Sequence, residues 1–346
     1  MSLTLHPIDP VAHRQELSAV LGRNLTDLDH ARRFEWLYLA NPAGPARAWF
    51  LREGAGAAVA VASLFPRWMW LHGQPRLCGQ VGDFAVDAGY RSLGPAVLLQ
   101  RATFQPVDAQ ELTFCYDCPP HDRGMATFQR LRLTPNCRMV RYARLLKVDR
   151  LVRRYVRPPL AAAPLSAAGN TVLRLVGRRG RRPAGTEVSV LTGRFDDEVS
   201  RLDEALGSGH AIRSRRHADD LNWRYRDDPL HEYLVLTARR GGALVAFAVL
   251  IQQRDDAYLV DLFGRLDDGV ALELVAAAVD RLRRTSVQTL HALVAERSPL
   301  TSVLEAGGFR YRSPGASIVA YARDGSDVKS TLTTADWSLT ESDIRA

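Results

Sequence analysis

The strongest constraint on this chain is a short phrase that it contains twice. Residues 34–44 read FEWLYLANPAG and residues 221–231 read LNWRYRDDPLH, so both copies follow the pattern W-x-Y-x-x-N/D-P. Each copy is followed by the same series of patterns: a strand hairpin, a strand, a helix, a strand, a helix and a closing strand. Similar order at similar spacing indicates an internal duplication. We therefore predict two copies of one fold.

The length of the chain agrees with two domains, because 346 residues exceed what one hydrophobic core usually serves. We place the first domain at residues 1–148, a connector at 149–186 and the second domain at 187–346. Each domain is expected to be of the α/β (α+β) class, with a mixed, mostly antiparallel sheet flanked by helices. We interpret the repeated phrase as architectural: its Trp and Tyr brace the first helical region against the sheet, and its Pro ends that region.

The net charge of +8 is concentrated in the connector. Between Arg150 and Arg182 there are nine arginines and no Asp or Glu, and the rest of the chain is nearly neutral. The folded domains are therefore not expected to bind a specific nucleic acid. Two interpretations of the connector stay open, a solvated linker and a peripheral contact with an anionic membrane surface.

The sequence favours a cytoplasmic protein. Its N-terminus lacks the pattern of a signal peptide, and no apolar run is long enough to span a bilayer. Four cysteines are too few for a disulfide scaffold, so reduced thiols are expected. Two of them form the pair Cys115-x-x-Cys118, but a structural zinc site needs two further ligands at close spacing. We predict no metal site.

The most specific chemistry lies in residues 83–102, DFAVDAGYRSLGPAVLLQRA. An apolar strand that includes Phe84–Val86 ends in a short turn, and a helix is expected to begin at about Gly94. Helix N-termini present unpaired N–H groups and the positive end of the helix dipole, which suits a pyrophosphate. Glycine at position 94 lets a ligand approach the backbone, and Arg91 adds a nearby cation. This turn is therefore a predicted phosphate site.

The stretch FAVDAGYRSLGPAVLL resembles the coenzyme A-binding motif of the GNAT-type N-acetyltransferases, a strand, an R-x-x-G-x-[GA] turn and a helix. Arg91, Gly94 and Ala96 occupy the three motif positions. The resemblance implies acetyl-CoA or another acyl-CoA as cofactor, with the strand backbone at the thioester carbonyl and the turn amides at the pyrophosphate. Pro95 lies within the turn and has no backbone N–H, so one of the possible hydrogen-bond donors to the pyrophosphate is missing. The implied cofactor residues are Phe84, Ala85, Val86, Arg91, Leu93, Gly94, Ala96 and Val97.

The whole chain resembles tandem GNAT proteins. It looks most like a GNAT type associated with bacterial exopolysaccharide gene sets, and more distantly like mycothiol synthase-like enzymes and the FemAB-type aminoacyl transferases. The second copy does not keep the phosphate-binding turn, because Asp267 and Asp268 stand where the amides should be and would repel a pyrophosphate. We expect the second half to have lost its cofactor site and to complete the acceptor cleft or a homodimer surface.

Amine acylation needs a neutral amine, a stabilised oxyanion and a proton for the departing thiolate. Asp83 is a candidate base, and Tyr116 or Asp117 could bind the acceptor amine. The resemblance implies a tyrosine as general acid in the following helix, but the equivalent position is Phe128, which cannot donate a proton. Tyr116, Cys118 or water would then protonate the thiolate.

We therefore predict an acyl-CoA-dependent N-acyltransferase that acts on an amine. The resemblance suggests an amino sugar or a sugar-linked intermediate as acceptor, either free or attached to a glycan. Two alternatives stay open: an aminoacyl transferase that uses charged tRNA, and a non-catalytic binding or scaffold protein with this fold.

Overall fold

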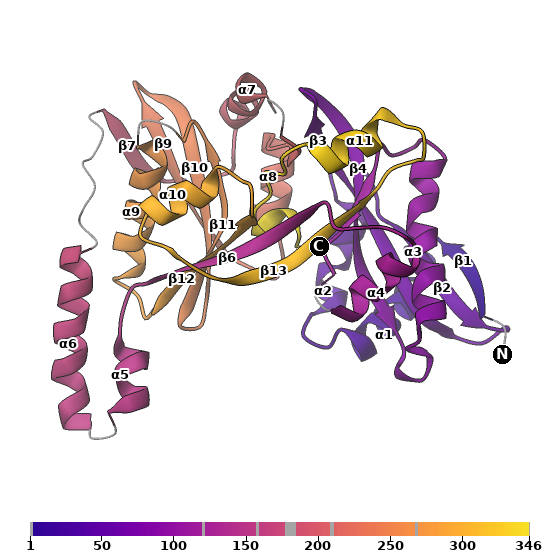
Figure 1. Ribbon diagram of the computed structural model, residues 1–346, viewed down its shortest axis with the longest axis horizontal. Helices are drawn as coiled ribbons and strands as arrows, with labels where there is room; N and C mark the ends of the chain where they lie inside the picture. Colours follow the sequence, from indigo (N-terminus) through magenta and orange to yellow (C-terminus); the bar gives the residue numbers. More distant parts are fainter. Residues whose placement is uncertain are drawn as a thin grey trace.

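The computed structural model of the chain describes residues 3–119, 122–156, 159–176, 185–207, 211–266 and 269–345. These residues form two lobes joined by long strands (Figure 1). Among them, no helix combines the length and the apolar character that crossing a bilayer would require. Asp267 and Asp268, which were expected to replace the phosphate-binding amides of the second half, lie outside the described residues.

In the described residues of the first half, helices precede and follow a run of three successive strands. Its elements, in chain order, are β1 (Leu3–Ile8), α1 (Arg14–Asn24), α2 (His30–Phe34), the π-helical turn η1 (Glu35–Leu39), β2 (Arg47–Glu53), β3 (Ala58–Leu71), β4 (Gln74–Val86), the 3-10 turn η2 (Ala88–Tyr90), α3 (Leu93–Asp108), β5 (Cys115–Asp117), α4 (Asp122–Arg130) and β6 (Cys137–Leu145).

Two helices of the connector, α5 (Asp149–Tyr155) and α6 (Pro159–Val176), pack side by side and project from the second lobe, where Arg150 pairs with Asp256 of that lobe (Figure 1). The second half then repeats the order of the first. Its elements are β7 (Thr186–Val190), α7 (Asp197–Leu206), β8 (Arg213–Ser214), α8 (Ala218–Tyr225), β9 (Tyr233–Arg240), β10 (Ala243–Gln253), β11 (Asp256–Gly264), α9 (Val270–Leu282), β12 (Thr289–Ala295), α10 (Leu300–Ala306), β13 (Arg310–Tyr321), α11 (Asp327–Thr334) and the 3-10 turn η3 (Glu341–Asp343).

The two halves share one sheet, with the order β1-β2-β3-β4-β5-β13-β6-β12-β11-β10-β9-β7. Its pairs are antiparallel except β4–β5 and β11–β12, which are the equivalent pairs of the two copies. The closing strands are exchanged: β13 of the second half pairs with β5 of the first, and β6 of the first half pairs with β12 of the second. The sequence patterns identified both closing strands but not their exchange.

Each lobe buries apolar side chains on both faces of its part of the sheet. In the first lobe, Leu64, Leu99 and Phe128 belong to the core beneath α3 and α4, whereas Phe50 and Tyr38 belong to the core beneath α1 and α2. Because side chains alternate along a strand, neighbouring residues of β4 and β5 point to these two different layers. The fold is therefore a mixed, mostly antiparallel sheet flanked by helices, as the sequence predicts. The domain boundaries at residues 148 and 187 stay a prediction.

Candidate functional site

The two copies of the repeated phrase meet between the lobes. Trp36 of η1 and Trp223 of α8 are 187 positions apart, and their rings stack with centroids 5.1 Å apart and planes 24° apart. Each indole also donates to the backbone of the other: Trp36 Nε1 lies 2.7 Å from the Trp223 carbonyl oxygen, and Trp223 Nε1 lies 2.9 Å from that of Trp36. The tryptophans thus brace the two halves against each other, rather than each against its own sheet.

The tyrosines of the phrase do contact their own sheets. Tyr38 donates to Asp83 of β4 (2.7 Å), and Tyr225 donates to Asp261 of β11 (3.0 Å). Each aspartate is buried and also accepts from a buried guanidinium, Arg33 in the first half and Arg216 in the second. A buried carboxylate needs such partners to stay charged. The tyrosines therefore hold each copy of the phrase against its own sheet.

A break in the sheet follows the pairing of β4 with β5. These parallel strands are paired only at Gly79–Cys115 and Gln80–Tyr116, and β4 continues to Val86 without β5 beside it. The register of β3 against β4 shifts close to Asp83, whose φ is +47°. The Asp87 N–H bonds to Val59 of β3, so by strand alternation the Val86 N–H points to the open edge. This edge is where the resemblance expects a thioester carbonyl.

The predicted phosphate turn lies at the start of α3. In the part of the chain that the structure describes, no side chain caps this helix, and its first turn contains no carboxylate, so the backbone N–H groups of the exposed residues Leu93 and Gly94 remain available. A Cβ at Gly94 would meet no atom within 4 Å. Arg91 closes the turn, because it donates to the Val86 carbonyl (2.9 Å) and to Asn24 Oδ1 (3.0 Å). The donors present thus fit an anionic group.

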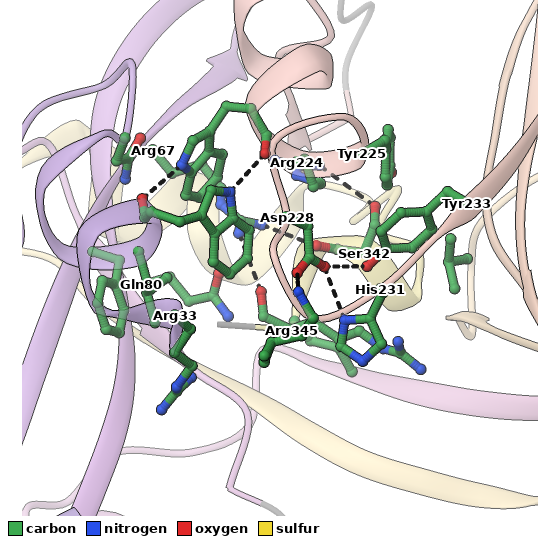
Figure 2. A pocket seen from close by; sticks show the side chains of 18 of the residues that line it. Arg33, Arg67, Gln80, Arg224, Tyr225, Asp228, His231, Tyr233, Ser342 and Arg345 are labelled. Atoms are coloured by element: carbon green, nitrogen blue, oxygen red, sulfur yellow. Dashed lines mark hydrogen bonds and ion pairs between the residues drawn. The ribbon is translucent and has the colours of Figure 1, made fainter. Parts of the chain in front are cut away.

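A cavity of about 400 Å³ lies between the lobes on the side of the tryptophan pair (Figure 2). This volume falls within the range of small-molecule sites. Gln80, at the point where β4 and β5 separate, reaches it from the first lobe; it is buried, and its Oε1 has no hydrogen-bond partner among the described residues. The lining residues are Leu28, Arg33, Trp36, Leu37, Asn41, Phe65, Pro66, Arg67, Gln80, Trp223, Arg224, Tyr225, Asp228, Leu230, His231, Tyr233, Gln253, Val260, Ser342, Ile344 and Arg345.

The C-terminal segment forms part of the cavity wall and is held by Asp343. Burial raises the pKa of this fully buried carboxyl, but the guanidiniums of Arg216, Arg224 and Arg67 more than offset that effect and lower the pKa to about 2. Arg67 belongs to the first lobe and the other two to the second. The Asp343 carbonyl oxygen also accepts from Tyr116 (2.7 Å). One aspartate thus joins both halves beneath the cavity.

The structure separates the predicted catalytic residues. Asp83 is engaged by Arg33 and Tyr38, and the hydroxyl of Tyr116 is buried against Asp343. Burial raises the pKa of Tyr116 to about 12. Both side chains face the layer that contains the cavity. The Asp83 carboxylate already accepts from two partners, and the Tyr116 hydroxyl donates to a carbonyl oxygen, so neither is free to exchange a proton with a substrate.

Asp117 and Cys118 end β5. By strand alternation Asp117 shares the face of Cys115, whose core also contains Phe128 under α3 and α4. Burial raises the pKa of Asp117 to about 7 and that of Cys118 to about 12. Phe128 is 2% exposed and fills the core. Asp117 is therefore the group of this set that exchanges a proton near neutrality.

Sequence reasoning missed the second-lobe wall of the cavity. His231 lines the cavity with Asp228 and Tyr233. A signal was available, because these residues end or closely follow the second copy of the phrase and differ from the corresponding residues of the first. The arginines of the wall, Arg67 and Arg224, carry no comparable pattern.

No protein-family model matches the sequence, and no curated protein matches it significantly. Solved structures do share its fold. A probable N-acyltransferase from Enterococcus faecalis V583 is similar over 93% of this chain and 73% of its own, with a TM-score of 0.66 and 11% identity. A GCN5-related N-acetyltransferase from Anabaena variabilis ATCC 29413 is similar over 92% and 72%, with a TM-score of 0.64 and 11% identity.

The Saccharomyces cerevisiae N-myristoyltransferase with bound myristoyl-CoA is also similar, over 92% of this chain and 82% of its own, with a TM-score of 0.59 and 13% identity. These matches cover both halves. The chain therefore has the fold of the GCN5-related N-acetyltransferases, as the turn at Arg91, Gly94 and Ala96 suggested. The association with exopolysaccharide genes stays a prediction.

Proposed function

We propose that the protein is an acyl-CoA-dependent N-acyltransferase whose cofactor site lies in the first lobe. The observation that carries this proposal is the separation of β4 from β5 next to the uncapped N-terminus of α3. The turn amides of Leu93, Gly94, Ala96 and Val97 would bind the pyrophosphate, and the backbone from Phe84 to Val86 would bind the thioester carbonyl. Acetyl-CoA is the narrower hypothesis for the donor.

The acceptor amine would occupy the cavity between the lobes and reach the thioester past Gln80. Five aromatic side chains line this cavity, Trp36, Phe65, Trp223, Tyr225 and Tyr233. Flat apolar walls suit an amine carried on a ring or another rigid body, including an amino sugar.

Asp117 would serve the donor side of the reaction. It faces the α3 side of the sheet, and a pKa of about 7 keeps part of its carboxyl protonated at neutral pH. A protonated carboxyl there could transfer its proton to the departing thiolate, in place of the tyrosine that Phe128 replaces.

Calorimetric titration with acetyl-CoA, myristoyl-CoA and free CoA tests the cofactor site. We expect micromolar binding by the native protein. Gly94→Glu should weaken it at least ~10-fold, because a carboxylate beside the pyrophosphate is repelled by its charge. The space around Gly94 admits a side chain, so this variant should still fold.

Gly193→Glu is the matched control, since Gly193 is also exposed with no atom near its potential Cβ. It should bind CoA like the native protein. Equal binding by both variants would contradict the site, and no binding by the native protein would contradict the function. Tight CoA binding with no transfer to any of a broad amine panel would favour a non-catalytic protein. Salt-sensitive RNA binding without CoA binding would favour the tRNA-dependent alternative.

A further inference from the structure

Three of the positions at which the second copy and the residues after it differ from the first carry polar side chains that contact one another. At the spacing of 187 residues that relates Trp36 to Trp223, the triplet Asn41, Gly44 and Ala46 corresponds to Asp228, His231 and Tyr233. The same side-chain contact opens the loop in both copies: Asn41 Oδ1 accepts from the N–H two residues on (3.0 Å), and Asp228 Oδ1 does likewise (2.8 Å). The first copy thus serves as an internal reference for the second.

The other terminal atoms of these two side chains, Asn41 Nδ2 and Asp228 Oδ2, make different contacts. Asn41 Nδ2 donates to the Pro66 carbonyl oxygen (2.8 Å), which is a purely structural contact. Asp228 Oδ2 lies 2.9 Å from His231 Nδ1 and accepts from the hydroxyl of Tyr233 at 2.8 Å (Figure 2). The second copy has therefore exchanged a backbone contact for a carboxylate that holds an imidazole.

The partners of Asp228 determine where the proton of His231 lies. Burial raises the pKa of Asp228, but its hydrogen bonds from His231, Leu230 and Tyr233 lower it overall, so the carboxylate is ionised at neutral pH and can only accept. His231 Nδ1 must then carry a hydrogen. In the neutral ring, Nε2 keeps its lone pair.

His231 lies on the wall between two spaces. It lines the cavity between the lobes, and it also lines a second, more open hollow together with Arg32 and Glu232. About a third of its side chain is exposed. A proton taken up from the cavity therefore has a route to solvent.

We propose that His231 is the general base toward the acceptor amine and that Asp228 positions it; this rests on the function proposed above. His231 Nε2 takes one proton from the acceptor ammonium. The amine nitrogen then forms the C–N bond to the thioester carbonyl carbon as the C–S bond breaks. The second proton lost by nitrogen ends on the CoA sulfur, and His231 returns its proton to solvent through the open hollow.

Several charged groups surround this pair. Asp228 is the acidic residue in hydrogen-bond contact with the ring. The charged groups that line the cavity from other elements are Arg33 of α2, Arg67 of β3, Arg224 of α8 and Arg345 of the C-terminal segment; Arg32, Arg226 and Glu232 line the hollow.

The proton positions can be measured in the whole protein by nitrogen NMR of 15N-histidine-labelled samples, with His231→Gln to assign the signal. We expect a protonated Nδ1 and an unprotonated Nε2 at pH 8. Asp228→Asn, which restores the residue type of position 41, should abolish this preference and change the titration midpoint of the ring. An Nε2–H tautomer in the native protein would overturn the proposal.

Release of the CoA thiol from acetyl-CoA, with water or 2-phenylethylamine as acceptor, tests the reaction between pH 5.5 and 9. The native rate should fall at low pH with the NMR midpoint of His231, and His231→Gln should lower it at least ~100-fold with unchanged acetyl-CoA binding. An unaltered rate in that variant, or no release by native protein that binds acetyl-CoA, would overturn this proposal alone. Absence of acetyl-CoA binding would overturn the proposed function as well.

Discussion

Single residues in this protein act through pairs that join distant parts of the chain. The tryptophan pair is the clearest example, since each indole both stacks on and donates to the other copy. An offset aromatic pair contributes about 0.5–1.5 kcal/mol beyond its buried area, and each hydrogen bond contributes about 1 kcal/mol. The contact between the lobes therefore depends strongly on two residues.

Replacing either tryptophan should destabilise the protein by about 3 kcal/mol, as is typical for truncating a large aromatic side chain in a packed site. Because Trp36→Ala and Trp223→Ala remove the same contact, the double variant should lose clearly less than the sum. Urea unfolding of the three variants measures this. Additive losses would show that the rings act independently, contrary to the stacked geometry.

Asp117 should make stability depend on pH. Its pKa of about 7 in the folded protein exceeds the usual value of 3.8, so the folded state holds a proton that the unfolded state has lost between these values. Stability therefore falls as pH rises from about 4 to 7. Asp117→Asn removes this dependence, so its melting temperature relative to native protein should be higher at pH 8 than at pH 5. An equal difference at both pH values would contradict the raised pKa.

Most helices and strands could be predicted from the sequence, but the pairing of the closing strands could not. The spacing of apolar residues placed the helix after the phosphate turn and both closing strands, because that periodicity is local. It could not show that β13 pairs with β5, since the patterns of the two closing strands suit either neighbour. The cavity was missed for the same reason: Gln80 and His231 are brought together only by tertiary packing. By contrast, the change from Asn41 to Asp228 was visible in the sequence.

The connector helices present an unusual surface for a linker. Leu151 and Tyr155 of α5, and Leu165 and Val172 of α6, are large apolar side chains that are half or more exposed. Each pair is spaced to share one helix face, and α5 also carries Arg153 and Arg154. Apolar residues beside arginines suit an anionic membrane surface. This favours the membrane contact over a solvated linker.

We therefore expect the protein to sediment with vesicles that contain phosphatidylserine and not with vesicles of phosphatidylcholine alone. Replacing Leu151 and Tyr155 with Glu should abolish this binding, and added salt should weaken it. Val11→Glu, at another exposed apolar position, is the control. Failure to bind anionic vesicles would support a solvated linker.

At the scale of the whole molecule, the exchanged strands make the halves interdependent. Without residues 310–321, β5 has no partner on one side, and without residues 137–145 the same holds for β12. Asp343 adds a buried charge network that also requires arginines from both halves.

Residues 1–148 expressed alone should therefore fail to form a stable monomer, although a conventional domain of this length would fold. Co-expression with residues 149–346 should restore a soluble one-to-one complex that binds CoA like the intact chain. Circular dichroism and size-exclusion chromatography would show both results. A cooperative, monomeric fragment 1–148 would contradict the interdependence of the halves.

The exchange also sets an order for events on the ribosome. The edge of β5 is complete once residue 117 has been synthesised, but its neighbour β13 begins only at residue 310. At synthesis rates of about 5–20 residues per second, that edge stays open for roughly 10–40 s. During this interval the nascent first lobe is an unfinished sheet, open to pairing with other chains. Faithful production of this protein should therefore depend on what protects that edge while the second half is being made.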